Sequence, residues 1–322
     1  NKEEYPEPYE DKLDIEKKDL EKTLGSKARL KTLLKNELKS DIEIYGDDRK
    51  SPIVSRKEAT AFDETELISS DPVTVILSKR GWVRVAKGHD VEAESLNYRE
   101  GDSFFTSAKG RNNQNAVFFD SKGKAYTLPC HSLPSARGQG EPLTGRLNAE
   151  SGETFAGVVA GPLESKVVLA TSEGYGFVAN LGDLQTKNKS GKAALKVSEG
   201  AKVLPPKLVS TSEDRIAAIS NIGKLLVFPV SELPELSRGN KIMGIPKPKF
   251  QSGEESLSFM TVLEESTNLK LINGKTHYSP KPKDLDNFIG GRGKRGLSLP
   301  PGYRNLDAIE VISKKTSDQD PE

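Results

Sequence analysis

The sequence predicts an all-β, propeller-like array of five repeated units that follows a short helical segment. The main observation is a hairpin glycine followed ten or eleven residues later by an apolar residue, which occurs five times. The pairs are Gly81 with Val91, Gly123 with Leu133, Gly174 with Leu184, Gly223 with Leu233, and Gly274 with Leu285. Self-similarity with a period of about forty to fifty residues is typical of radial all-β arrays. We number the units 1 to 5 by these glycines.

A second observation is that a strand-like apolar run precedes each glycine. These runs are Val73–Leu77, Ala116–Phe119, Val167–Ala170, Ile216–Ile219 and Leu269–Ile272. Glycine supplies the positive φ that tight hairpins demand, so a return strand is expected after each one. A further strand should close most units, at Ser103–Ser107, Thr154–Val159, Lys202–Leu204, Leu257–Leu263 and Ala308–Ile312. About four strands in each of five units is a propeller-like count.

The remaining segments are predicted from periodicity and charge. Residues 1–48 are expected to form helices, with Leu13, Leu20 and Leu24 on one face, a break at Gly25 and an N-cap at Ser26. Because this segment begins inside charged helical sequence and exposes many leucines, we expect it to pack against more of a longer chain. Residues 49–72 are predicted to be a connector, 73–312 the β domain, and 313–322 an acidic tail that is disordered or folds back on the basic surface.

Composition narrows the classes of function. The net charge is only +1, but Lys and Arg are in excess in the repeat region and Asp and Glu in both flanks. This asymmetry favours a polyanionic partner, with a merely solvated basic surface as the alternative. A single cysteine excludes an internal disulfide, and three widely separated histidines give no metal-ligand spacing. No apolar run is long enough to predict membrane insertion. We expect no metal or cofactor in this segment.

Four of the five units carry a glycine-rich loop with Lys or Arg after the apolar marker. We call these the basic loops: residues 135–140, 187–192, 237–241 and 290–296. Glycine and basic side chains in equivalent places of a repeat favour phosphate contacts without base readout. The alternative is that surface loops commonly contain Gly and Lys. The candidate DNA contacts are Arg137, Arg146, Lys187, Lys189, Lys192, Arg238, Lys241, Arg292, Lys294 and Arg295, with a second group at the hairpins, Lys79, Arg80, Arg84, Lys122 and Lys124.

Other candidate sites are weaker. Trp82 lies in a predicted strand and is expected in the blade core rather than as a base-stacking platform. Cys130 has no basic partner nearby in sequence and is expected to be structural. The glycines of 290–296 have no βαβ context, so a nucleotide loop is not predicted.

Several specific runs resemble a known family. They include Gly81–Arg84, Leu133–Gly145, Gly174–Val178 and Phe228–Pro234. On these residues the chain resembles the C-terminal domain of bacterial type IIA topoisomerase A subunits, more closely the topoisomerase IV branch than the gyrase branch. The resemblance implies a five-bladed β-pinwheel with a basic outer rim that guides duplex DNA. It also implies that residues 1–48 are the end of a coiled coil.

The resemblance has consequences for activity. Gyrase carries a Gln-Arg-Arg-Gly-Gly-Arg-Gly box in its first blade, whereas unit 1 offers only the more acidic Glu94–Gly101. This difference favours a decatenating enzyme over one that wraps DNA tightly. The family's nucleophile is a Tyr directly after an Arg, and none of the eight tyrosines follows an arginine. The segment is therefore expected to bind DNA and not to cleave it.

The resemblance also implies partners and a location. The parent protein would be an ATP-dependent topoisomerase that uses ATP and Mg²⁺ elsewhere, in which this chain is joined by the topoisomerase IV B subunit, together with a second A subunit. A bacterial cytoplasmic, nucleoid-associated location is implied. Two alternatives stay open: a protein-interaction propeller that recruits a chromosome-associated partner, and a gyrase A domain that wraps DNA.

Overall fold

The computed structural model describes residues 7–47, 68–150, 152–235 and 239–313. Its contacts divide the chain into two units, Asn1–Ala61 and Phe62–Glu322, which are described separately. None of the helices within the described ranges combines the length and the apolar character needed to span a bilayer.

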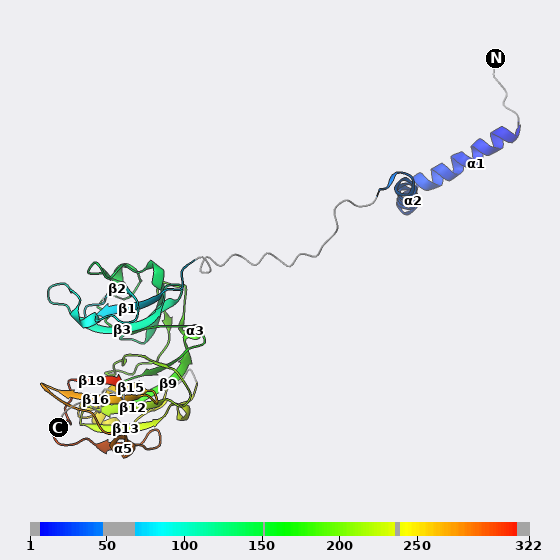
Figure 1. The fold of residues 1–322 in the computed structure, drawn as a ribbon. Coiled ribbons are helices and arrows are strands. Elements are labelled where there is room, and N and C mark those ends of the chain that lie inside the picture. The colour runs from blue at the N-terminus through cyan, green and yellow to red at the C-terminus, as the bar shows by residue number, and fades with distance from the viewer. Residues whose placement is uncertain (1–6, 48–67, 151, 236–238, 314–322) are drawn as a thin grey trace. The chain divides into compact units, whose positions relative to one another are not determined.

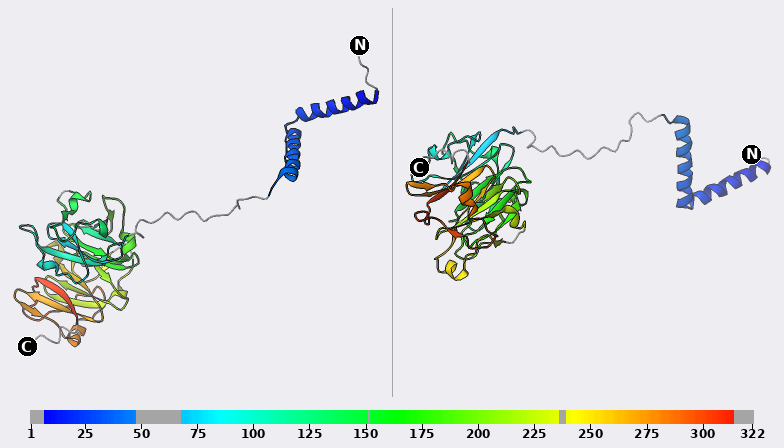
Figure 2. Two further views of the ribbon diagram at one scale, coloured as in Figure 1. Left: turned by 45° about the horizontal axis from the view of Figure 1, so that its top comes forward. Right: turned by 60° about the horizontal axis from the view of Figure 1, so that its bottom comes forward.

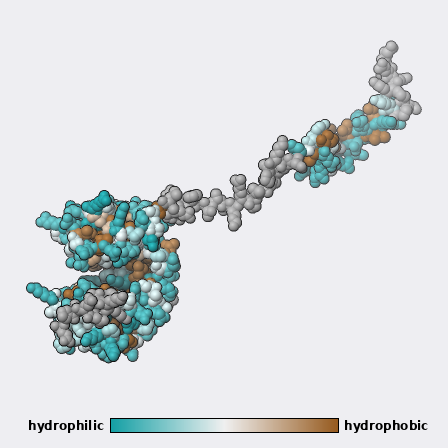
Figure 3. All heavy atoms as spheres, in the orientation of Figure 1, coloured by the Kyte–Doolittle hydropathy of each residue, from teal (hydrophilic) through white to brown (hydrophobic). Residues whose placement is uncertain are grey.

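The first unit contains two helices, α1 (Glu7–Leu24) and α2 (Lys27–Tyr45), as the periodicity predicts. Ser26 caps α2, because its hydroxyl accepts a hydrogen bond from the amide of Arg29. Their leucines are largely exposed, with Leu24 at 74 % and Leu38 at 60 % of full exposure. Figure 3 shows these apolar side chains in brown along both helices.

The second unit contains five small antiparallel sheets, which we call blades 1 to 5 (Figure 1). The strands of each blade are given in their spatial order across the sheet. Blade 1 contains β3 (Phe104–Arg111), β1 (Pro72–Ser78), β2 (Trp82–Lys87) and β6 (Glu141–Pro142). Blade 2 contains β10 (Lys192–Ala193), β5 (Lys124–Pro129), β4 (Asn115–Asp120) and β7 (Phe155–Ala160). Blade 3 contains β11 (Lys207–Val209), β8 (Lys166–Ala170), β9 (Tyr175–Asn180) and β14 (Asn240–Lys241).

The last two blades follow the same plan. Blade 4 contains β15 (Leu257–Leu263), β12 (Arg215–Ser220), β13 (Lys224–Pro229) and β18 (Leu297–Ser298). Blade 5 has three strands, β17 (Thr276–Tyr278), β16 (Thr267–Asn273) and β19 (Ala308–Ser313). Short helices occupy the connections: η2 (Ala93–Ser95), η3 (Cys130–Ser132), η4 (Leu143–Gly145), α3 (Leu181–Leu184), η5 (Val230–Glu232), α4 (Lys247–Gln251) and α5 (Pro282–Asp286).

Neighbouring blades exchange strands. The two-residue strands β6, β10, β14 and β18 each come from the unit that follows the blade they join. We call them the exchange strands. In blade 1, for example, Val83 of unit 1 pairs with Glu141 of unit 2. Each of the first four blades is therefore completed by its successor in the chain.

The hydrophobic cores lie between consecutive blades. Alternate residues of a strand point to opposite faces, and the central strands are buried on both. In β4, Ala116 and Phe118 contribute to the core shared with blade 1, whereas Val117 and Phe119 contribute to the core shared with blade 3. The same arrangement links blades 3 and 4, and blades 4 and 5.

Blades 1 and 5 are the two ends of an arc. Among the described residues no hydrophobic core joins them, and Figures 1 and 2 show the cyan and orange sheets as separate ends on the same side of the β unit. The free face of blade 1 carries Ile76 and its cross-strand partner Arg84. Both are buried, because the segment containing Ala93 and Tyr98 folds over this face, with Tyr98 stacked on Arg84. This segment caps the first blade, as terminal repeats of such arrays require.

The predicted fold class and nearly all strands are confirmed. The five hairpins form at the predicted glycines, each with positive φ. One closing strand is wrong: Lys202–Leu204 forms only an isolated bridge at Val203 to Thr171, and the strand is β11, at Lys207–Val209. Pro205 and Pro206 lie between them and donate no backbone hydrogen bond, which separates the bridge from the strand.

Candidate nucleic-acid interface

The basic loops lead into the exchange strands, so each lies on the outer edge of the blade before it. The same hydrogen bond fixes this position in all four cases. The backbone amide of an apolar residue after the loop donates to the carbonyl of the hairpin glycine. The donor and acceptor pairs are Leu143 and Gly81, Leu195 and Gly123, Ile242 and Gly174, and Leu299 and Gly223, at 2.7–2.9 Å. All four donors are buried, so they anchor the loops. The structure thus places the described parts of the four basic loops equivalently on four consecutive blades.

Three glycines of these loops have a structural cause. Gly140, Gly191 and Gly296 all have positive φ, a conformation that L side chains rarely adopt. A Cβ on Gly140 would also lie 2.5 Å from the carbonyl oxygen of Val83, and one on Gly296 would lie 2.5 Å from that of Leu225. These glycines allow the loop to cross the outer strand of the preceding blade. They are explained without a ligand.

The basic side chains of the loops fall into two groups. Members of the first are exposed and make no side-chain hydrogen bond or ion pair with another described residue; they are Arg137, Lys187, Lys189, Lys241 and Lys294. They occur on the outer edges of blades 1, 2, 3 and 4. Their charges are available to an anionic partner. Arg238 lies outside the described residues.

Members of the second group are engaged within the protein. Arg146 donates to the carbonyl of Ser132 at 3.0 Å and pairs with Glu141, while Lys192 donates to the carbonyl of Asp183 at 2.7 Å. Arg292 donates to the carbonyl of Lys241 at 2.9 Å, and Arg295 pairs with the buried carboxylate of Glu255. These four residues brace the loops and offer fewer donors to a ligand.

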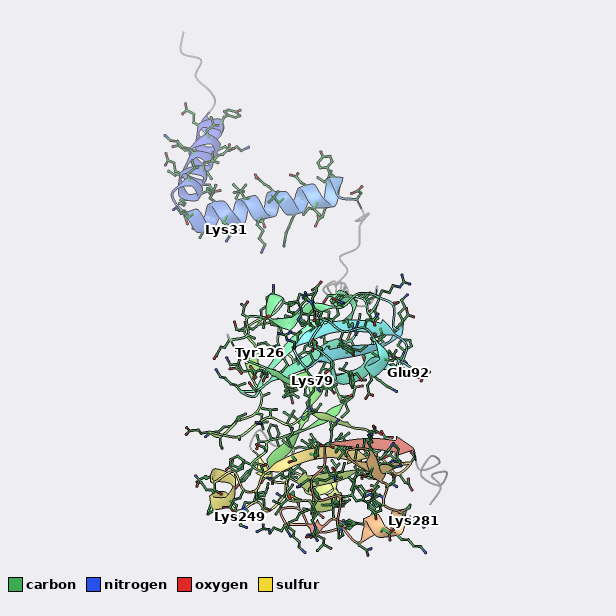
Figure 4. All side chains as sticks on the ribbon, turned by 90° about the vertical axis from the view of Figure 1, so that its left-hand side faces the viewer. Lys31, Lys79, Glu92, Tyr126, Lys249 and Lys281 are labelled. Atoms are coloured by element: carbon green, nitrogen blue, oxygen red, sulfur yellow. The ribbon has the colours of Figure 1, made fainter. Side chains whose placement is uncertain are left out.

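The hairpin residues also divide. Lys79 and Arg80 are exposed at the tip between β1 and β2; Asp102 accepts from the backbone amide of Arg80, but no described side chain pairs with the charged group of either residue. Lys122 contacts Glu150 and Glu153, and Lys124 contacts Glu150 at 2.9 Å. Hydrogen bonds from both lysines lower the pKa of Glu150 to about 2, and its carboxylate raises the pKa of each lysine. Figure 4 labels Lys79 on blade 1 and Lys281 beside α5.

Arg84 does not belong to the surface at all. It is 3 % exposed, and its guanidinium donates at 2.9 Å to the carbonyls of Asn97 and Gly138. Its ring neighbour is Tyr98, 4.5 Å from the guanidinium carbon. Because the side chain is buried and its Nη1 is bonded to these two carbonyls, Arg84 is not a DNA contact but a positioning residue for the loop at 135–140.

For two residues of unit 1, the observed position differs from what the sequence predicted. Trp82 is only half-buried, and the guanidinium carbon of Arg99 lies 4.3 Å from its ring centroid. The expectation that Trp82 lies in the core is therefore wrong, because its position on the free face of blade 1 leaves it no neighbouring blade. Arg99 was missed, since it stands in an otherwise acidic stretch. Only its proximity to the single tryptophan after folding distinguishes it.

Other chemistry is limited within the described ranges. Cys130 is buried beside blade 1, and burial raises the pKa of its thiol to about 12, which agrees with a structural role. Among these residues no group of three or more His, Cys, Asp or Glu side chains is arranged to hold a metal ion.

Comparisons with known proteins agree with this geometry. The family model described as DNA gyrase C-terminal domain, beta-propeller, matches residues 165–210 and 214–263. The A subunit of DNA topoisomerase 4 from Pseudomonas aeruginosa is 50 % identical over 299 residues, which are 92 % of this chain and 40 % of that protein. The same subunit of Escherichia coli K12 is 42 % identical over 94 % of this chain. The chain spans 40 % of the length of each relative.

A solved structure resembles about three quarters of the chain. The E. coli ParC C-terminal domain superposes with a TM-score of 0.65 and 43 % identity, over 76 % of this chain and 100 % of that one. A DNA gyrase A C-terminal domain, at 14 % identity and a TM-score of 0.55, shares the fold. On these findings the chain belongs to the family of C-terminal domains of the DNA topoisomerase IV A subunit.

Proposed function

We propose that this chain is the part of a topoisomerase IV A subunit that binds and guides duplex DNA through phosphate contacts. The proposal rests on one observation: exposed Lys and Arg side chains without a described partner recur on the outer edges of four consecutive blades. Cations in equivalent positions around an arc suit a regularly spaced polyanion, and no base-reading element is needed.

The proposal assigns roles to individual residues. Arg137, Lys187, Lys189, Lys241 and Lys294 contact phosphates directly, and Lys79 and Arg80 extend the contact surface at blade 1. Arg146, Lys192, Arg292 and Arg295 hold the loops in place. This chain contributes no catalytic residue; strand cleavage and the use of ATP and Mg²⁺ belong to other parts of the enzyme. Its partners in the bacterial cytoplasm are the topoisomerase IV B subunit, together with a second A subunit. Decatenation and relaxation are activities of the whole assembly.

Salt dependence tests the proposal. If about six phosphates are engaged, the affinity of the full chain for duplex DNA should fall about a thousandfold between 50 and 200 mM salt. Changing Arg137, Lys187, Lys241 and Lys294 together to Ala should lower the slope of log affinity against log salt by about 4 for all DNA sequences alike. A flat salt response, or no duplex binding at low salt, would instead support a protein-interaction propeller.

Bending distinguishes the gyrase-like alternative. Tight wrapping should shorten the end-to-end distance of a long duplex strongly, whereas guiding along an open arc changes it little. Fluorescence energy transfer between dyes at the two duplex ends measures this distance. In the holoenzyme, deletion of residues 73–312 should spare relaxation and impair decatenation of linked circles.

A further inference from the structure

Unit 1 lacks a basic loop, yet the structure gathers two arginines on the free face of blade 1. Trp82 is the first residue of β2 and pairs with Pro142 of the exchange strand β6. It therefore lies at the outer edge of the blade, beside the basic loop of unit 2. Arg99 approaches from the capping segment and lies across the indole ring.

An open hollow of about 640 Å³ surrounds this stack. Its lining residues are Arg80, Trp82, Arg99, Glu100, Asp102, Gln139, Pro142 and Thr144. Arg80 reaches into it over Gly101, where its Nη1 lies 3.7 Å from the place a Cβ would take. Two guanidinium groups thus border one hollow on the edge of the sheet.

The neighbouring carboxylates leave these guanidinium groups free. Asp102 accepts hydrogen bonds from the hydroxyl of Ser78 at 2.6 Å and from the amides of Arg80 and Ser103 at 3.0 and 2.8 Å. Its oxygens are thereby directed toward the hairpin. Glu100 is exposed and forms no ion pair with a described residue. Because it also borders the hollow, its charge repels an anionic ligand there, although it occupies neither guanidinium group.

A guanidinium stacked on an aromatic ring keeps its N–H donors in the plane of the fork, where they match a phosphate bidentately. Stacking also restricts the side chain before binding, which lowers the conformational entropy lost when the contact forms. Arg99 meets both conditions, because its ring contact is made and its donors are unused by other described residues.

We propose that Arg99, held on Trp82, and Arg80 form a phosphate-binding site through which unit 1 contacts the backbone of duplex DNA. This inference rests on the proposed DNA-binding function. The site adds a second kind of contact to blade 1, whose outer edge already carries the basic loop of unit 2. The site reads backbone and not bases.

Trp82 is the only tryptophan of the chain and so reports on the site directly. The full chain is titrated with a dye-labelled blunt duplex, while dye anisotropy and tryptophan emission are recorded together. We expect the emission to change with the same midpoint as the anisotropy. Arg99→Ala should lower the salt slope by about 1, and Glu100→Gln should tighten binding.

Lys109→Ala is the matched control. Lys109 is exposed on β3, at the opposite edge of the same sheet, and its loss changes the net charge by the same amount. We expect it to leave the salt slope unchanged. If the wild-type chain binds duplex with a steep salt slope, but Trp82 emission stays constant and Arg99→Ala binds like wild type, this inference is wrong and the proposed function stands. If the wild-type chain does not bind duplex, the proposed function fails, and this inference fails with it.

Discussion

The guanidinium of Arg84 donates a 2.9 Å hydrogen bond to the carbonyl of Gly138, which joins the second strand of unit 1 to the basic loop of unit 2. A second bond to the carbonyl of Asn97 holds the segment that caps blade 1. One buried side chain therefore positions both the cap and the loop that carries Arg137. Arg84, which the sequence suggested as a surface contact to DNA, is therefore a buried residue that positions its neighbours.

Arg84→Ala should destabilise the β unit by about 2 kcal/mol or more, because it leaves buried carbonyls without their donor. Urea unfolding followed by circular dichroism measures this loss. Arg137→Ala is the matched variant, since the exposed Arg137 should change the free energy of unfolding by less than about 0.5 kcal/mol. Equal effects of the two variants on stability would contradict the positioning role of Arg84.

Free and paired lysines should differ in DNA binding. Lys187→Ala should lower the salt slope by about 1, because its charge has no partner among the described residues. Lys122→Ala should leave the slope unchanged, because Glu150 and Glu153 already neutralise Lys122. Fluorescence anisotropy at several salt concentrations gives both slopes. A larger effect at Lys122 than at Lys187 would overturn this division.

Alanine substitutions at two glycines should separate the cost of a strained backbone φ from the cost of a steric clash. Gly200 and Gly296 have φ values of +76° and +73°, but a Cβ on Gly200 meets nothing within 4 Å. Gly200→Ala should cost about 1–2 kcal/mol, the penalty of the left-handed conformation alone. Gly296→Ala should cost about 1–3 kcal/mol more, because its Cβ would collide with the carbonyl of Leu225. Urea unfolding of both variants tests this, and equal losses would contradict the proposed crossing geometry.

Alkaline pH should destabilise the protein through Cys130. Burial raises the pKa of this thiol to about 12, whereas in the unfolded chain it titrates near 8.5. Between these values the unfolded state releases a proton that the folded state keeps, so stability is lost as pH rises. The slope is at most about 1.4 kcal/mol per pH unit.

Cys130→Ala removes this titration, so its unfolding free energy should fall less steeply between about pH 8.5 and about pH 10, below the ordinary range of tyrosine. The loss of packing in the variant is a constant offset and does not alter the slope. Urea midpoints across this range provide the measurement. If the unfolding free energy of variant and wild type falls with pH at the same rate, the thiol is accessible in the folded chain or already perturbed in the unfolded chain.

The repeat and its strands were predictable because their signals are local. A glycine with positive φ at Gly174, after the apolar run at Val167–Ala170, specifies a hairpin without reference to the rest of the chain. The helices and the break at Gly25 follow from the same kind of local pattern. Strand exchange was not predictable, since β10 and β14 are two residues long and pair with residues of a different unit.

The candidate site was predictable in place but not in detail. The basic loops were identified from composition, but the sequence does not show that Lys187 and Lys192 differ. Only in the folded chain does Lys192 donate to the carbonyl of Asp183, whereas Lys187 has no such contact. Arg99 illustrates the opposite case. Its neighbours Glu94 and Glu100 marked the segment as acidic, and the ring it contacts lies seventeen residues earlier in the chain.

Strand exchange also imposes an order of assembly during synthesis. Blade 1 has its hairpin once residue 87 has been made, but its outer strand and its anchor Leu143 arrive only with unit 2. The same delay holds for blades 2, 3 and 4, each of which waits for the next unit to leave the ribosome. Because chains emerge at about 5–20 residues per second, each of these four blades spends several seconds with an unpaired edge. The last unit ends this sequence, because blade 5 receives no strand from a later one among the described residues.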